Sequence, residues 1–146
     1  MIIETMKIED YEAVYDLWLS SPGMSLNTSD DSREGIAFYL RRNPETCFTA
    51  KEGNRIIGVI MAGHDGRRGY IHHTAVHPEY RRKGIGRKLV EKALDALERE
   101  GINKVALVVF ERNDGGNAFW EKMGFTSRKD LVYRNRLIHD LERIDT

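Results

Sequence analysis

The chain has 146 residues, of which 40% are hydrophobic and 32% are charged, and this length and mix suit one domain with a buried core. Lys and Arg together number 23, as do Asp and Glu, so no overall charge favours nucleic acid or an anionic membrane, and we expect neither partner. The start does not resemble a signal peptide and no apolar run reaches membrane-spanning length, so we expect a cytoplasmic protein with a single domain over residues 1–146.

The spacing of apolar residues divides the first half of the chain into strands and helices. The expected elements are, in order, a strand over 1–6, a helix from Ile8 to about Ser20, a polar stretch with N-cap candidates over 25–32, a helix through Ile36 and Leu40 that ends before Pro44, and hairpin strands over 46–51 and 55–64. Cys47, the single cysteine, excludes an internal disulfide and a cysteine-rich metal site. Its apolar neighbours predict a buried thiol.

The second half continues the alternation of strands and helices. The expected elements are a hairpin turn over 65–69, a strand from Tyr70 to Val76, a helix from Ile85 to about Glu100, a strand over 104–110 that is buried on both faces, a helix from Asn113 to Met123, a last strand pair over 125–137, and a tail from Ile138 that forms a short strand or a helix. One mixed α/β domain follows from this order.

The stretch from residue 76 to residue 89 joins the end of a strand to the start of a helix through a basic loop. Pro78 cannot donate to a ladder and ends the strand. Gly84 and Gly86 let the backbone turn tightly and approach a ligand. The first N–H groups of the helix lack partners and carry the positive end of the helix dipole, which predicts a backbone cradle for a pyrophosphate. The basic residues around this cradle are Arg81, Arg82, Lys83, Arg87 and Lys88.

Three families of phosphate-binding loop could account for this stretch. A P-loop needs Lys-Ser or Lys-Thr directly after its second glycine, but Arg87-Lys88-Leu89 follows Gly86 here. A dinucleotide fingerprint needs a third Gly or Ala at the position of Leu89, and a tight strand-to-helix turn in place of a basic loop with a proline. In contrast, Arg81-Arg82-Lys83-Gly84-Ile85-Gly86 resembles the Arg/Gln-x-x-Gly-x-Gly/Ala signature of the GNAT family of N-acetyltransferases. The resemblance implies a mixed, mostly antiparallel central sheet of about six or seven strands, flanked by about four helices and with splayed central strands.

The same resemblance implies acetyl-coenzyme A as the acyl donor. We expect no metal, because His72 and His73 are adjacent and no third ligand stands at a characteristic spacing. In the family, the pantetheine arm enters between the splayed strands and pairs with exposed backbone, here that of Thr74, Ala75 and Val76. The residues implied to surround the pyrophosphate are Arg81, Arg82, Lys83, Gly84, Ile85, Gly86 and Arg87.

A second stretch, from Asn113 to Phe125, is similar to the family's Asn-x-x-Ala-x-x-Phe-Tyr-x-x-x-Gly-Phe signature. Asn113 is implied to face the ligand, and it also suits a helix cap. Gly116 replaces the alanine, and Trp120 replaces the tyrosine that protonates the coenzyme A thiolate in many members. An indole N–H donates a hydrogen bond but does not release its proton. Trp120 then has two possible roles: it covers the thioester and excludes water, or it is an aromatic residue of the core.

Candidates for the general base lie on the strand before the basic loop. They are His72 first, then Tyr70 and His73, because histidine titrates near neutral pH and some family members place their base on this strand. On a regular strand Tyr70 and His72 share one face and His73 points to the other. We expect His77 to have a positional role only. The acidic residues Asp30, Asp31 and Glu34 could attract a cationic substrate, but they are interpreted first as helix-cap charges.

We therefore expect an N-acetyltransferase that moves acetyl from acetyl-coenzyme A to a primary amine of a small molecule or of a protein or peptide. A catalytically silent acyl-coenzyme A binding or sensing module is the alternative, favoured by Trp120. A structural protein without a ligand leaves the basic loop unexplained. Dimerisation through the last strands is common in the family, and no residue here decides for or against a homodimer.

Overall fold

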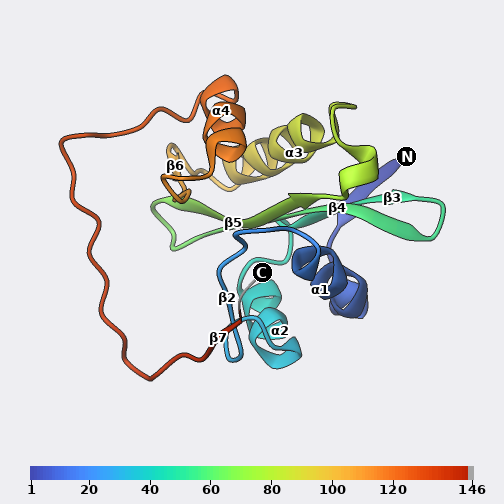
Figure 1. The fold of residues 1–146 in the computed structure, drawn as a ribbon, viewed down its shortest axis with the longest axis horizontal. Coiled ribbons are helices and arrows are strands. Elements are labelled where there is room, and N and C mark those ends of the chain that lie inside the picture. The colour runs from blue at the N-terminus through green and yellow to red at the C-terminus, as the bar shows by residue number, and fades with distance from the viewer. Residues whose placement is uncertain (145–146) are drawn as a thin grey trace.

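A five-stranded sheet in the order β1-β3-β4-β5-β6 forms the centre of the computed structural model, which describes residues 1–144 (Figure 1). Its strands are β1 (Ile2–Thr5), β3 (Phe48–Glu52), β4 (Arg55–His64), β5 (Gly69–Val76) and β6 (Val105–Ala106). All neighbours are antiparallel except β5 and β6, which confirms a mixed, mostly antiparallel sheet. Two further strands, β2 (Leu26–Asn27) and β7 (Arg143–Ile144), form a separate antiparallel pair, so the short strand expected in the tail is present.

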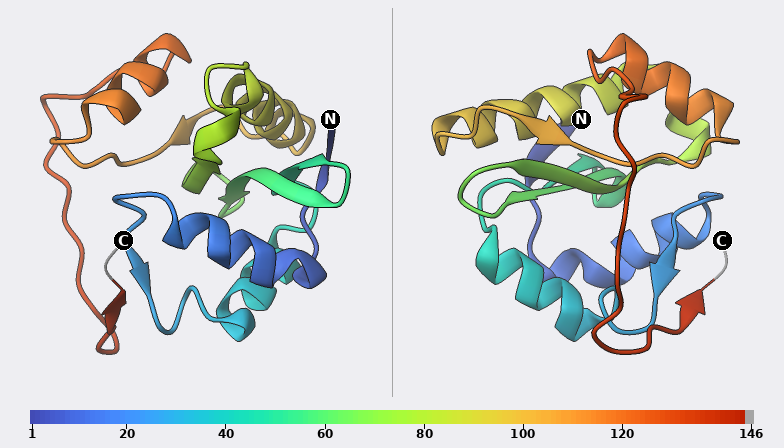
Figure 2. Two further views of the ribbon diagram at one scale, coloured as in Figure 1. Left: turned by 45° about the vertical axis from the view of Figure 1, so that its right-hand side comes forward. Right: turned by 90° about the vertical axis from the view of Figure 1, so that its left-hand side faces the viewer.

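Four α-helices within residues 1–144 cover the two faces of this sheet. They are α1 (Tyr11–Leu19), α2 (Arg33–Arg42), α3 (Ile85–Arg99) and α4 (Asp114–Lys122). Figures 1 and 2 show α1 and α2 on one face and α3 and α4 on the other. Short 3-10 turns, Ile8–Asp10 and Pro78–Tyr80, precede α1 and the basic loop. No helix within the described range has the length and apolar composition that a membrane crossing needs.

Each helical layer packs its own core against the sheet. The apolar stripe of α3 buries Leu89, Ala93 and Leu97 under the strands, as the helical spacing predicts. On the opposite face, α1 buries Val14 and Trp18. Because both faces are covered, the central strand β4 is buried over most of its length.

Cys47 lies in the core formed with α1 and α2, fully buried as predicted. Its burial raises the pKa of the thiol to about 12, because an apolar environment disfavours the thiolate. The thiol is therefore a packing group.

A β-bulge interrupts β5 at His73 and Thr74. Val59 pairs with Ala75 and Met61 pairs with His72, so two residues of β5 lie opposite Ile60 alone. The backbone of His73 turns into the left-handed region, with φ of +35°. The bulge breaks the alternation of side chains along the strand.

The bulge places His73 on the same face as His72. The His72 ring lies 5.7 Å from Tyr39 of α2, and the His73 ring lies 5.0 Å from Trp18 of α1. The prediction that His73 points to the opposite face is wrong, because that prediction assumed a regular strand.

The last strand of the sheet, β6, separates from β5 after two residue pairs. Only Gly69↔Val105 and Tyr70↔Ala106 are paired, which leaves the rest of β5 without a neighbour on this side, as the expected splay requires. The prediction of a strand over 104–110 buried on both faces is wrong: the strand has two residues, and Val108 is 60% exposed. Within the described part of the chain, no strand pairs with the outer edge of β6 to bury it.

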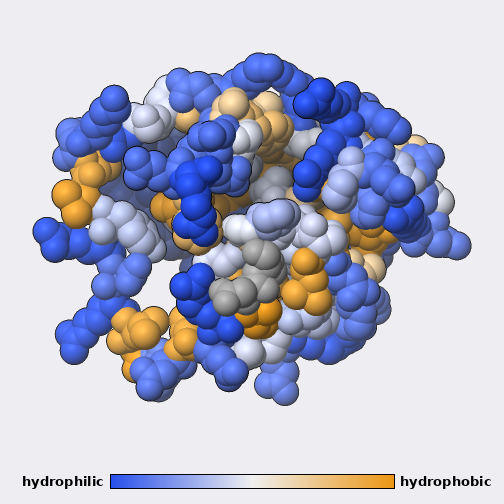
Figure 3. All heavy atoms as spheres, viewed as in Figure 1, coloured by the Kyte–Doolittle hydropathy of each residue, from blue (hydrophilic) through white to orange (hydrophobic). Residues whose placement is uncertain are grey.

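The strand pair expected over 125–137 is absent, and this segment runs as an extended loop outside the sheet (Figure 1). Apolar side chains are exposed along it, and Figure 3 shows them as orange spheres on the outlying chain at the left. The exposed aliphatic residues are Leu131, Val132 and Leu137, followed by Ile138 just beyond the segment, and Tyr133 is exposed as well. Residues with high strand propensity form a strand only where a neighbouring strand or a packed face is available. Within the described structure, no strand of the sheet offers such a surface to this segment.

Candidate active site

The basic loop leads from β5 into α3 through two residues with left-handed backbone. Arg82 has φ of +63° and Gly84, the N-cap of α3, has φ of +79°. Open space surrounds the position that a Gly84 side chain would take, so backbone conformation and not crowding requires the glycine. The backbone N–H groups of residues 82–87 donate no hydrogen bond to any described residue. Six consecutive free amides at a helix N-terminus form a site for an anion.

The basic side chains of this loop are engaged to different degrees. Arg81 Nε donates to the carbonyl oxygen of Val76 at 3.1 Å, and Lys83 Nζ lies 5.2 Å from the centre of the Tyr80 ring. Arg87 forms a loose pair with Glu91 at 3.9 Å, and both side chains are more than half exposed. Ile85 is buried in the core, so its side chain packs and only its backbone N–H is free for a ligand.

Gly86 lets α4 pack against the first turn of α3. A Cβ at this position would lie 3.2 Å from two carbon atoms of the Phe119 ring, a contact tighter than side chains normally make. Gly86 therefore has a packing role, and the close approach of a ligand to its backbone stays a prediction. The next residue, Trp120, is half-buried, with its ring 5.0 Å from Phe119 and 5.2 Å from Phe125. The core-aromatic role is the one that these contacts support.

Asn113 caps α4, since its Oδ1 accepts from the backbone N–H of Gly116 at 2.9 Å. A Cβ at Gly116 would lie 2.5 Å from Asn113 Nδ2. Glycine at this position therefore leaves room for the capping side chain, which gives the departure from alanine a structural reason.

The backbone of β5 beyond the bulge presents alternate residues to the gap beside β6. His77 donates its backbone N–H to Ile57 of β4 at 2.8 Å, and Ala75 pairs with Val59 of the same strand. By alternation, the main chains of Thr74 and Val76 face away from β4. The pantetheine-binding prediction thus suits Thr74 and Val76 but not Ala75, whose main chain faces β4 and whose side chain is buried.

His72 stands between two tyrosines. Its ring lies 4.6 Å from Tyr70 and 5.7 Å from Tyr39, which keeps much of the ring from water although the residue as a whole is exposed. Burial, followed by the neighbouring His73, lowers the pKa of His72 to about 4. Burial also raises the pKa of Tyr70. Both groups are therefore neutral at pH 7, and His72 is a weak base.

We expect His72 to make folding stability depend on pH. The unfolded histidine takes up a proton below about pH 6.5, whereas the folded one does so only near pH 4, so stability falls as the pH drops through this window. Relative to His72→Gln, the wild type should lose about 1 kcal/mol between pH 7 and about pH 5, after allowance for the exposed part of the ring. Urea unfolding at both pH values measures this difference. An equal difference between the two proteins at both pH values would contradict the expectation.

His73 forms a buried ion pair or hydrogen bond with an acidic residue of the loop before α2. Its Nε2 lies 2.7 Å from Asp31 Oδ1, and the two side chains are only 15% and 5% exposed. Asp31 Oδ2 accepts from the backbone N–H of Asn27 at 2.9 Å. The Trp18 indole N–H donates to the backbone oxygen of His73 at 3.2 Å. Strand β5, α1 and the loop before α2 are joined at this one residue.

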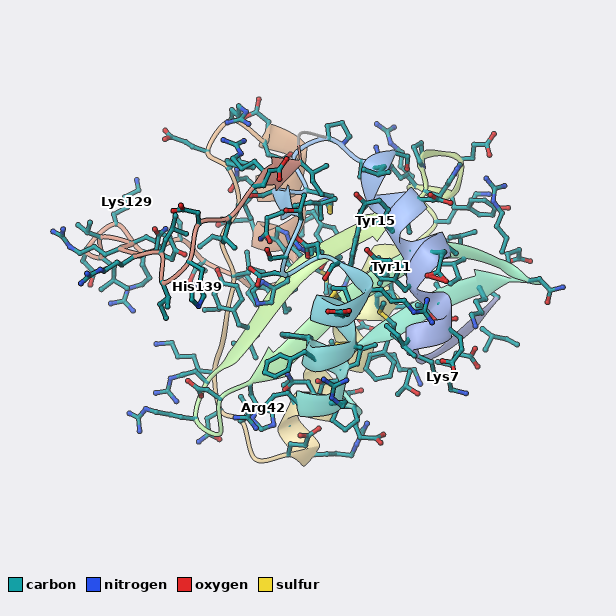
Figure 4. All side chains as sticks on the ribbon, turned by 90° about the horizontal axis from the view of Figure 1, so that it is seen from below. Lys7, Tyr11, Tyr15, Arg42, Lys129 and His139 are labelled. Atoms are coloured by element: carbon teal, nitrogen blue, oxygen red, sulfur yellow. The ribbon has the colours of Figure 1, made fainter. Side chains whose placement is uncertain are left out.

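Asp31 was interpreted from the sequence as a helix-cap charge, and that interpretation is wrong. The cap of α2 is Ser32, whose side chain accepts from the backbone N–H of Gly35. Asp31 instead lies in the site with His73, and Tyr11 Oη donates to its backbone oxygen at 2.6 Å. Figure 4 shows Tyr11 and Tyr15 on the side of α1 that faces α2. The pairing of Asp31 with a residue 42 positions away has no periodic signal in the sequence.

The remaining histidine of this region, His77, has the positional role that was predicted. Its Nδ1 accepts from the backbone N–H of Glu79 at 3.2 Å, and its Nε2 lies 3.0 Å from Arg55. Across residues 1–144, no group of three His, Cys, Asp or Glu side chains is placed to hold a metal ion.

Comparison with known proteins places this geometry in a family. A model described as the acetyltransferase (GNAT) family matches residues 11–125. An acetyltransferase of Photorhabdus laumondii is 32% identical over 148 residues, which cover 97% of this chain and 99% of the relative. Another acetyltransferase, from Pectobacterium atrosepticum, is 31% identical over 142 residues with the same coverage.

A solved structure shares the fold. The PaiA N-acetyltransferase from Thermoplasma acidophilum, in complex with coenzyme A, superposes with a TM-score of 0.74 at 22% identity, over 88% of this chain and 92% of that one. With the family model covering most of the sequence and the relatives nearly all of it, the chain belongs to the GNAT family of acetyltransferases and is an N-acetyltransferase.

Proposed function

We propose that the protein transfers acetyl from acetyl-coenzyme A to a primary amine of a small molecule, a protein or a peptide, by direct attack in a ternary complex. The observation that carries this proposal is the run of free backbone amides over residues 82–87, next to strand β5, whose edge toward β6 is unpaired beyond Tyr70 in the described structure. The coenzyme A complex of the PaiA enzyme supports the same donor.

The residues present suit coenzyme A in two places. The free amides, the α3 dipole and the exposed charges of Arg82 and Lys83 suit the pyrophosphate. The main-chain groups of Thr74 and the backbone N–H of Val76, which face away from β4, suit the amides of pantetheine, which pair as a strand would. Arg81 contributes by holding the Val76 carbonyl at the entrance of this gap.

The acceptor must lose a proton, and the donor must release a thiolate. A lysine-like amine with a pKa of about 10.4 costs roughly 4.6 kcal/mol to neutralise at pH 7, whereas an N-terminal amine near 7.7–8.0 costs only about 1 kcal/mol. Trp120 stands where many members of the family carry a proton-donating tyrosine, and its indole supplies no proton. The thiolate of coenzyme A therefore leaves without an acid at that position.

Release of thiol from acetyl-coenzyme A over a panel of amines tests the proposal. The panel contains spermidine, kanamycin and peptides with free N-termini, and each is matched by an acetylated or hydroxyl counterpart that lacks the primary amine. We expect thiol release above background only with primary amines, in step with a mass gain of one acetyl group on the acceptor. Equal release with the amine-free counterparts, or an unchanged acceptor mass, would contradict the assignment to amine acetylation.

A further inference from the structure

We propose that His73 is the general base for the acceptor amine and that Asp31 positions it, so that the two residues act as a pair. This inference rests on the proposed function, since it concerns how the amine loses its proton. The sequence favours His72 over His73 as the general base and favours a helix-cap role for Asp31.

The contacts of the pair define which nitrogen of His73 is free. An ionised carboxylate only accepts hydrogen bonds, so the neutral ring carries its proton on Nε2, which faces Asp31 Oδ1 at 2.7 Å. Nδ1 then keeps its lone pair and has no hydrogen-bond partner within residues 1–144. It is also not a buried atom, because the only buried side-chain polar atom without a partner in that range is Thr49 Oγ1. The lone pair of Nδ1 is thus unpaired and not fully buried.

The backbone fixes where this lone pair lies. His73 forms the bulge of β5 and directly precedes Thr74, the first residue proposed to meet pantetheine. Its left-handed φ of +35° is held by the Trp18 donation to its carbonyl oxygen, and strain of this kind concentrates at functional sites. Asp31 is itself fixed by the N–H of Asn27 and by Tyr11. Because both the backbone and the ring of His73 are fixed by hydrogen bonds, the residue loses little conformational entropy when the amine binds.

The chemical step balances with these groups alone. The amine nitrogen forms a bond to the acetyl carbon, and its proton passes to His73 Nδ1. The carbon–sulfur bond breaks, and its electron pair leaves with the coenzyme A thiolate. The imidazolium then faces the Asp31 carboxylate through Nε2–H, which stabilises the new charge. It returns its proton to the thiolate or to solvent.

Few other charged groups face the pair. On β5, the His72 ring lies 6.1 Å away and is neutral at pH 7, as its lowered pKa requires. From α1 the titratable neighbours are Tyr11 and Tyr15, whose rings stack at 5.7 Å. From the loop before α2, Asp30 is exposed and accepts from Asn27 Nδ2 at 3.1 Å. Among the described residues, Asp31 is the only ionisable side chain in hydrogen-bond contact with the His73 ring.

Variants of the pair with a matched control test the inference. His73→Gly suits the left-handed backbone, Asp31→Asn removes the charge but keeps the shape, and Asp30→Asn makes the same charge change one residue away. With the best amine of the panel, His73→Gly should lose about 100-fold in kcat and Asp31→Asn about tenfold, with KM for acetyl-coenzyme A unchanged. Asp30→Asn should behave as the wild type. Added imidazole should restore part of the rate of His73→Gly only.

A readout that needs no substrate completes the test. Long-range proton–nitrogen NMR spectra of the wild type should show His73 as the Nε2–H tautomer, and Asp31→Asn should show a mixture of tautomers. A wild-type pH–rate profile in both variants, or an Nδ1–H tautomer in the wild type, would overturn the inference. If these proteins still bind coenzyme A in calorimetry, either of these two results contradicts the roles of His73 and Asp31 but not the proposed function. Absence of coenzyme A binding in the wild type would instead contradict the proposed function.

Discussion

Replacing Gly84 with glutamate is expected to weaken coenzyme A binding by at least about 100-fold, which corresponds to ~2.7 kcal/mol. The residue is the N-cap of α3 with φ of +79°, so a side chain there strains the backbone that presents the free amides. The new carboxylate also occupies the position of the anion and repels the pyrophosphate. Isothermal titration calorimetry with coenzyme A measures the change.

Two control variants separate charge from strain. Gly101→Glu introduces the same residue just beyond the other end of α3, at a glycine with φ of +83° and equally open surroundings. It should cost stability but leave coenzyme A affinity unchanged. Gly84→Ala should fall between the wild type and Gly84→Glu in affinity. Equal affinity of Gly84→Glu and Gly101→Glu would show that the loop does not contact the pyrophosphate.

Replacing Trp18 with alanine is expected to lower the free energy of unfolding by about 3–5 kcal/mol. The side chain is fully buried between α1 and the sheet, and the truncation leaves a cavity in this core. A loss of this size is a large part of the 5–15 kcal/mol that typically holds a domain together. Urea unfolding followed by circular dichroism gives the value.

Trp18→Phe tests the link between this core and the site. Phenylalanine keeps most of the aromatic volume but removes the N–H that donates to the His73 carbonyl, which should cost about 1–2 kcal/mol. Because the bulge is then less well held, acetyl transfer should fall more than stability does. Trp120→Ala, the same truncation as Trp18→Ala at a half-buried position, should destabilise less. A phenylalanine variant with wild-type activity would show that the Trp18 bond does not position His73.

The elements that local chemistry determines were predictable. Helix α3 begins after a left-handed glycine and ends before Gly101, and its apolar stripe is the one read from the spacing. The same holds for α2, which begins at the Ser32 cap and ends before Pro44. In these places, backbone freedom, capping and periodicity agree, so a single sequence specifies the element.

Features that depend on partners far along the chain were not predictable. The apolar run over 104–110 has the composition of a central strand, but its partner on one side pairs for two residues only. The segment over 125–137 has strand-like residues, yet within the described structure it lies against no edge. Strand propensity says nothing about which edge is available, so both predictions failed for the same reason.

The site divides in the same way. The residues of the basic loop were read from its glycines and charges, because a phosphate cradle is a local structure. The bulge at His73 depends on how β4 registers against β5, and the partner of His73 lies on a different element. The sequence alone favours a helix-cap role for an acidic residue in a polar loop. Only the fold shows that the Asp31 side chain is 5% exposed and lies within hydrogen-bond distance of the His73 ring.

Calorimetric titration of the wild type with coenzyme A and, separately, with pantetheine tests most directly whether the amides of residues 82–87 bind a pyrophosphate. Pantetheine keeps the arm that pairs with β5 but lacks the pyrophosphate and the adenosine 3′-phosphate joined to it. We expect saturable binding of coenzyme A and at least about 100-fold weaker binding of pantetheine, because two or three charge-assisted hydrogen bonds are lost. Equal affinities for the two ligands, or no heat with coenzyme A at millimolar concentration, would contradict the assignment of this loop.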